Sequence, residues 1–252
     1  MGLSSGRRAL LIRAVQNTEW RQLLDFVSPS LFDVMPFRAL LKQGRELGAN
    51  ATSRRTGEVR EALQKRLDAA GIPVQLEPNR RLETPAPEVR RALGQRALEV
   101  YFAQIFGGEE SFLDLRLACW SQSAPDATPV WAPRALWIRW APDFLAGVRD
   151  LYRGFYEEDD RAYARGVEAL GLGEAGDLLR RHFGEGDQTR VRFESKVFQT
   201  TFHEVFVRCR DQGITLHRNF LALGVYLATL YDLLEGLDEA FDVRSAFLRA
   251  TR

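Results

Sequence analysis

Residues 85–119, PAPEVRRALGQRALEVYFAQIFGGEESFLDLRLAC, contain a predicted helix that gives way to a predicted strand. Pro85 and Pro87 suit a first helical turn, and apolar residues then recur at helical spacing down to Phe106. After Gly107 and Gly108, apolar residues recur at every second position instead. The alternating apolar residues are Leu113, Leu115, Leu117 and Cys119. This alternation predicts a half-buried strand over residues 113–119.

A second strand is predicted at residues 135–140, where Leu136, Ile138 and Trp140 alternate with Trp137 and Arg139. The segment 121–133 is rich in Ser, Pro and Asp, so we expect the two strands to form a hairpin near residues 112–140. Helical spacing covers the rest of the chain: residues 9–26, 31–47 with a break at Pro36, 58–70, 143–156, 159–170, 177–183, 191–212, 219–237 and 243–249. The sequence therefore predicts an α+β fold that is mostly α-helical.

Residues 78–87 hold three prolines and several charges, which is typical of a linker. We therefore expect an N-terminal helical segment over residues 1–82 and a helical domain with the hairpin over residues 83–252.

Composition narrows the class of protein. The chain has 252 residues, of which 45% are hydrophobic, and 35 basic against 34 acidic residues give a net charge of +1. That balance argues against binding to nucleic acid by bulk charge. Cys119 and Cys209 lie far apart, so we expect reduced thiols. No signal peptide is predicted, and the longest apolar run, Phe220 to Leu234, is short and contains Asp232. We expect a cytoplasmic protein without a transmembrane segment.

Three stretches carry a family resemblance. Leu93–Phe106 reads LGQRALEVYFAQIF, Phe144–Leu172 contains DLYRGFYEEDDRAY and ends in LGL, and the region 205–243 contains GITLH, LALGVYL and LEGLD. In this order they resemble the UbiB-type atypical kinases, a protein-kinase-like family tied to coenzyme Q biosynthesis. The resemblance implies a helical body like a kinase C-lobe. It also implies that the predicted hairpin occupies the place of the family's catalytic loop and Asp-Phe-Gly segment.

The chain departs from that family where the chemistry would reside. Residues 111–119 read SFLDLRLAC, so Asp114 is the one candidate for a catalytic or metal-binding aspartate, and its strand phase predicts a solvent-exposed side chain. Residues 138–141 read IRWA, which puts Arg139 where the family has the carboxylate that holds magnesium. A cation cannot ligate a cation, and phosphoryl transfer depends on metal ions. No glycine-rich nucleotide loop occurs. We therefore predict no catalytic residue, no cofactor and no metal ligand.

Other residues leave alternatives open. Trp120, Trp131, Trp137 and Trp140 cluster around the hairpin, where they could pack the core or form a docking surface for a partner. His203 has no second histidine at metal-ligand spacing, which favours a structural role. The acidic run 157–160 is either a cation or basic-partner site or, the interpretation we favour, a solvated helix start.

The sequence thus predicts a non-catalytic, pseudokinase-like binding or regulatory subunit whose partner is another protein, in a homo- or hetero-oligomer. The alternative is a helical protein that binds an isoprenoid or other lipid, because the resembling family works with polyisoprenoid quinones and the helices here are rich in Phe and Leu. The four phenylalanines of the helix from Phe193 to Phe206 are more typical of a core than of a lipid groove. An enzyme of unrecognised chemistry ranks last, since no nucleophile with a matching base can be named.

Overall fold

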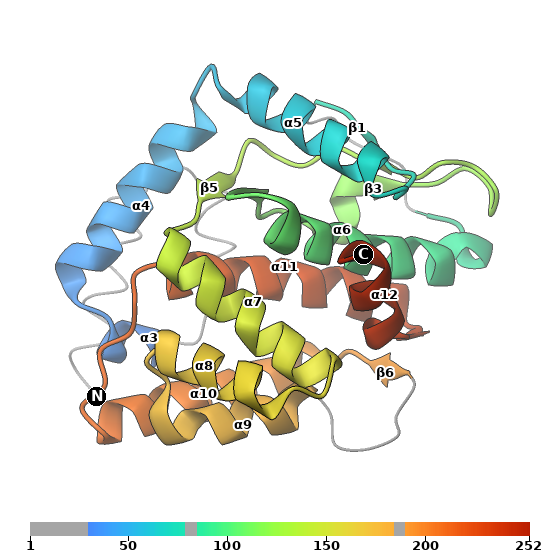
Figure 1. Cartoon of the computed structure of the whole chain (residues 1–252). Helices are drawn as coiled ribbons and strands as arrows, with labels where there is room; N and C mark the ends of the chain where they lie inside the picture. The colour runs from blue at the N-terminus through green and yellow to red at the C-terminus, as the bar shows by residue number, and fades with distance from the viewer. Residues whose placement is uncertain (1–29, 79–84, 184–189) are drawn as a thin grey trace. The chain divides into compact units, whose positions relative to one another are not determined.

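The computed structural model describes residues 30–78, 85–183 and 190–252. Helices dominate this part of the chain (Figure 1). They are α3 (Leu31–Val34), α4 (Phe37–Ala51), α5 (Thr56–Ala69), α6 (Arg90–Gly107), α7 (Pro142–Tyr156), α8 (Asp160–Ala169), α9 (Gly176–Phe183), α10 (Ser195–Asp211), α11 (Phe220–Leu237) and α12 (Val243–Ala250), with short 3-10 turns η1 (Pro87–Val89), η2 (Leu117–Cys119) and η3 (Gly173–Ala175). The predicted mostly helical α+β class is confirmed, and so is the break at Pro36.

Two predictions lie wholly or largely outside the described residues. The helix expected over residues 9–26 falls before residue 30, and most of the linker expected over residues 78–87 falls in the range 79–84.

The strands are short and form three small sheets among the described residues. They are β1 (Gln75–Leu76), β2 (Glu110–Phe112), β3 (Trp120–Ser121), β4 (Val130–Trp131), β5 (Trp137–Arg139), β6 (Val191–Arg192) and β7 (Ala240–Phe241). β4 lies between a parallel β1 and an antiparallel β3, while β2 pairs with β5 and β6 with β7, both antiparallel.

The single predicted hairpin therefore needs correction. Its second strand corresponds to β5, but its first strand is wrong, since β2 ends at Phe112 and residues 117–119 form the turn η2. The physical reason is burial. Leu113, Asp114 and Leu115 are all fully buried, so this segment does not alternate between an inner and an outer face.

The chain forms two compact units, each assembled from three segments. Of the described residues, unit 1 comprises 30–48, 140–183 and 195–228, and unit 2 comprises 49–78, 85–139, 190–194 and 229–252. The boundary expected between residues 82 and 83 falls outside the described residues and stays a prediction. Across it, β1 pairs with β4, with Gln75 opposite Val130.

Small residues set the packing of unit 1. A Cβ added to Gly166 in α8 would lie 2.5 Å from the backbone nitrogen of Leu151 in α7, so the two helices approach closely only because this position lacks a side chain.

A buried amide also connects distant segments of unit 1. The Asn219 side chain donates to Gln43 Oε1 at 3.0 Å and accepts from the Ala141 backbone at 3.0 Å.

Aromatic side chains fill unit 2. Phe102 in α6 packs edge-on against Phe247 in α12, with ring centroids 5.4 Å apart. Gly94 makes room for the ring of Phe241, because a Cβ there would overlap it. Through these contacts the long helix α6 packs against α12 and β7.

α11 is the one helix in the described ranges that is long and apolar enough, by length and composition, to cross a membrane. However, 83% of its apolar window is buried inside the structure. Burial of this kind is expected for a core helix, so the structure is compatible with a soluble protein.

The close approach of α7 and α8 gives a first prediction. Gly166→Ala should lower the free energy of unfolding by about 1–3 kcal/mol, because the added methyl group meets backbone atoms that cannot move aside independently. The matched control is Gly48→Ala in α4, where nothing lies within 4 Å of the new Cβ. Higher helix propensity should there raise stability by up to about 1 kcal/mol. Urea denaturation measures both, and equal effects of the two substitutions would contradict the packing described.

Candidate functional site

The sheet β2–β5 in unit 2 positions Asp114 and Arg139, the two residues at the kinase-like positions of the sequence. Glu110 lies opposite Arg139 and Phe112 opposite Trp137. The pairing continues past the strands, because the Leu113 backbone donates to the Leu136 carbonyl at 2.8 Å. Arg139 is thus on β5, and Asp114 lies two residues beyond the end of β2.

Asp114 is fully buried, which corrects the prediction that its side chain is solvated. Arg116 folds back onto it, with Nε 2.8 Å from Oδ1 and Nη2 2.7 Å from Oδ2. The Nε of Arg134 lies 3.7 Å from Oδ2. A carboxylate that leaves water needs compensating charge and hydrogen bonds, and a bidentate guanidinium supplies both. The alternating pattern could not predict this buried ion pair, because it places Asp114 and Arg116 together on the exposed face of a strand.

The backbone around Asp114 is held by buried side chains from other elements. Trp131 Nε1 donates to the Asp114 carbonyl at 3.1 Å, and Trp120 Nε1 donates to the Leu115 carbonyl at 3.0 Å. The Thr229 hydroxyl donates to the Leu113 carbonyl at 2.6 Å and accepts from the Leu115 amide at 3.2 Å. These bonds satisfy the polar backbone of a segment that forms neither helix nor sheet.

Nearby titratable groups respond to the same burial. Burial raises the pKa of the Cys119 thiol to about 12, with a further contribution from the negative charge of Asp114. Burial also raises the pKa of Asp232, while the Leu117 amide and Arg116 oppose that shift. The thiol therefore stays protonated at neutral pH, where it is a poor nucleophile.

The four tryptophans are core residues, so the proposed exposed docking surface made of these rings is corrected. The exposed fractions are 0% for Trp120 and Trp131, 2% for Trp137 and 1% for Trp140. Trp120 and Trp131 stack with centroids 5.3 Å apart, and Trp140 stacks on Phe144 at 5.9 Å. The large apolar area of each ring explains why folding buries it.

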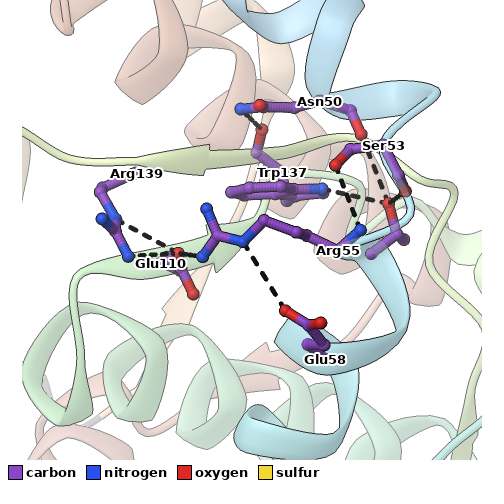
Figure 2. A network of polar contacts seen from close by, with 8 residues as sticks. Asn50, Ser53, Arg55, Glu58, Glu110, Trp137 and Arg139 are labelled. Atoms are coloured by element: carbon purple, nitrogen blue, oxygen red, sulfur yellow. Dashed lines mark hydrogen bonds and ion pairs between the residues drawn. The ribbon is translucent and has the colours of Figure 1, made fainter.

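Arg139 belongs to an exposed ion-pair network in unit 2, which Figure 2 shows from close by. Its Nε and Nη2 donate to Glu110 Oε1 at 3.2 and 2.9 Å. Arg55 Nη2 donates to the same oxygen at 3.0 Å, and Arg55 Nε lies 3.7 Å from Glu58. The side chains of Arg55 and Arg139 are 50% and 56% exposed, whereas that of Glu110 is 16% exposed.

Trp137 packs against the Arg55 side of this network. The Arg55 guanidinium lies over the indole, 5.6 Å from the ring centroid, a cation–π geometry. The indole Nε1 donates to Thr56 Oγ1 at 3.2 Å, and Asn50 Nδ2 donates to the Trp137 carbonyl at 3.1 Å. Sequence reasoning missed Arg55 and Glu110. Glu110 lies opposite Arg139 in the sheet, which is known only once the strand register is known, and Arg55 is recognised only by its contact with Glu110.

The surroundings of His203 and of the acidic run 157–160 indicate structural roles. His203 is exposed, and its Nδ1 lies 3.1 Å from the Ser30 hydroxyl. The described residues contain no group of three or more His, Cys, Asp or Glu side chains placed to hold a metal ion. The acidic run 157–160 is exposed, and Asp159 caps α8 by accepting from the backbone of Arg161 and Ala162, as the helix-start interpretation predicted.

Comparisons with known proteins place the chain in no family. No protein-family model matches it, and no curated protein matches it. The resemblance to UbiB-type kinases therefore remains a prediction from the sequence.

The buried ion pair gives a second prediction. Asp114→Asn should destabilise the protein by about 3 kcal/mol, because it leaves the Arg116 guanidinium, with a side chain only 13% exposed, without its counter-charge. The control is Glu174→Gln, which breaks an exposed pair with Arg208 and should cost below about 1 kcal/mol. Chemical denaturation distinguishes the two. A loss at Asp114 no greater than at Glu174 would show that the buried pair is not needed for stability.

The buried thiols give a third prediction. Burial raises the pKa of Cys119 to about 12 and that of Cys209 to about 11, so neither should be alkylated by iodoacetamide in the folded protein at pH 8. Both should react fully in denaturant. Mass spectrometry counts the added groups, and prompt labelling of the native protein would contradict the burial of these side chains.

Proposed function

We propose that this chain is a non-catalytic, pseudokinase-like binding or regulatory subunit that acts through a protein partner. The observation that carries the proposal is the engagement of both residues at the kinase-like positions. Asp114 is closed off by Arg116, and Arg139 is paired with Glu110.

The geometry at Asp114 supports a role without metal or nucleotide chemistry at this residue. A divalent cation needs carboxylate oxygens that face a ligand, and phosphoryl transfer needs that cation to neutralise the phosphates. Both oxygens of Asp114 already accept from the guanidinium of Arg116, inside the core. A metal ion would have to displace a partner that the loop itself supplies.

The exposed arginines around the sheet β2–β5 support a binding role. Arg55 and Arg139 present exposed guanidinium groups, and Arg55 is steadied by Trp137. Arginine is among the residue types that most often dominate protein interfaces. We also propose a cytoplasmic location.

The lipid alternative receives no comparable support. The phenylalanines of α10 pack on one another: Phe198 and Phe202 have ring centroids 4.5 Å apart, and Phe202 and Phe206 6.0 Å apart. All three are buried, which is what a helical core requires.

Thermal unfolding with and without millimolar ATP and magnesium tests the non-catalytic part of the proposal, our fourth prediction. We expect no shift of the midpoint. A ligand that binds the folded state tightly would add on the order of 2–4 kcal/mol and move the midpoint by several degrees. A magnesium-dependent rise would overturn the proposal.

Site-specific photo-crosslinking in the source cells tests the partner. A photoreactive amino acid replaces Glu109, which is exposed beside Glu110, and in a control it replaces Glu168, which is exposed in α8 of unit 1. A protein adduct specific to position 109 is expected. Lipid adducts, or the same adducts from both positions, would count against a protein partner at this surface.

A further inference from the structure

We infer that Arg55 and Arg139 bind a carboxylate of an acidic segment on the partner protein. This inference rests on the proposed function and names the chemistry that the partner must present. It follows from how the guanidinium donors at the edge of β2–β5 are used.

The donors of the two arginines far exceed the acceptor that the fold gives them. Each guanidinium carries five N–H donors, and one carboxylate carries about four lone-pair sites. Within the described residues, the three hydrogen bonds that the guanidinium groups of Arg55 and Arg139 donate all go to a single oxygen of Glu110, Oε1. Donors on both exposed side chains therefore face water, available to a second carboxylate.

One carboxylate serves both arginines. The guanidinium groups of Arg55 and Arg139 converge on Glu110, while Glu58 lies 3.7 Å from Arg55 and is 76% exposed. Solvent screens that exposed pair strongly, so Glu58 competes little with an incoming carboxylate for Arg55.

The site is arranged before a ligand arrives. Arg55 is held over the Trp137 indole, and its backbone amide donates to Ser53 Oγ at 3.2 Å. Arg139 is fixed on β5 by its pairing with Glu110. Side chains that are already ordered lose less entropy on binding, which favours affinity for a small ligand group.

These features favour an acidic protein segment over a polyanion. Tight binding of nucleic acid or anionic membranes depends on many unopposed cations, whereas this chain has a net charge of +1. A single carboxylate can instead pair with one guanidinium in the bidentate geometry that arginine prefers.

NMR titration of the full chain with a synthetic acidic peptide, acetyl-Gly-Glu-Asp-Glu-Gly-amide, tests the inference as our fifth prediction. The reporter is the Trp137 indole N–H, which donates to Thr56 beside Arg55 and is assigned with Trp137→Phe. We expect a saturable shift of this signal. The matched peptide with Gln and Asn in place of the acids should produce none.

Two substitutions should change the affinity in opposite directions. Arg139→Gln should weaken binding roughly tenfold, because it removes a charge-assisted contact. Glu110→Gln should tighten binding roughly two- to fivefold, because it removes the carboxylate that competes for both arginines. Arg38→Gln, an exposed arginine on α4 in unit 1, is the control and should leave binding unchanged.

Several results would overturn the inference. They are equal shifts with the uncharged peptide, no gain with Glu110→Gln, or a response to inorganic phosphate or phosphatidylserine vesicles without one to the peptide. The last would assign the site to phosphate-bearing ligands. Failure of this test while ATP and magnesium still cause no thermal shift would reject the acidic segment alone. A nucleotide-dependent shift would reject the proposed function itself.

Discussion

The side chain of Asp114 is carried out of water and into the interior of unit 2, and the Arg116 guanidinium compensates its charge. The segment that contains this pair has no regular structure between β2 and η2, so its backbone groups need other partners. Trp120, Trp131 and Thr229 supply them. The position of β2 against β5, and with it the surface around Arg139, thus depends on a loop organised by one ion pair.

Helix periodicity predicted most of the fold because helices are local. The helices over residues 58–70, 143–156 and 219–237 agree with α5, α7 and α11 to within two residues. The strand predicted at residues 113–119 failed because an alternating apolar pattern also arises when a segment is buried on all sides. The candidate site was harder to predict, since Arg55 and Glu110 are 55 residues apart and gain meaning only from their contact.

Arginine has two different roles within a short stretch of unit 2. Arg116 is mostly buried and satisfies a single carboxylate in a closed, bidentate pair. Arg139 is exposed and shares its acceptor with Arg55. A sequence pattern does not distinguish these two arginines, yet Arg116 stabilises the core and Arg139 remains available at the surface. The difference arises from burial and from the number of donors per acceptor, which explains why composition alone did not locate the site.

The division into two units of three segments each has a consequence for synthesis on the ribosome. Asn219 joins Gln43 and the segment at Ala141 in unit 1, while unit 2 needs Thr229 to hold the segment that follows β2. Neither unit can complete its core until the sequence near residues 219–229 has left the exit tunnel. Nascent chains therefore expose apolar helices for most of their translation, since non-local contacts form late. Such a chain should depend on chaperones more than a protein of equal size built from consecutive domains.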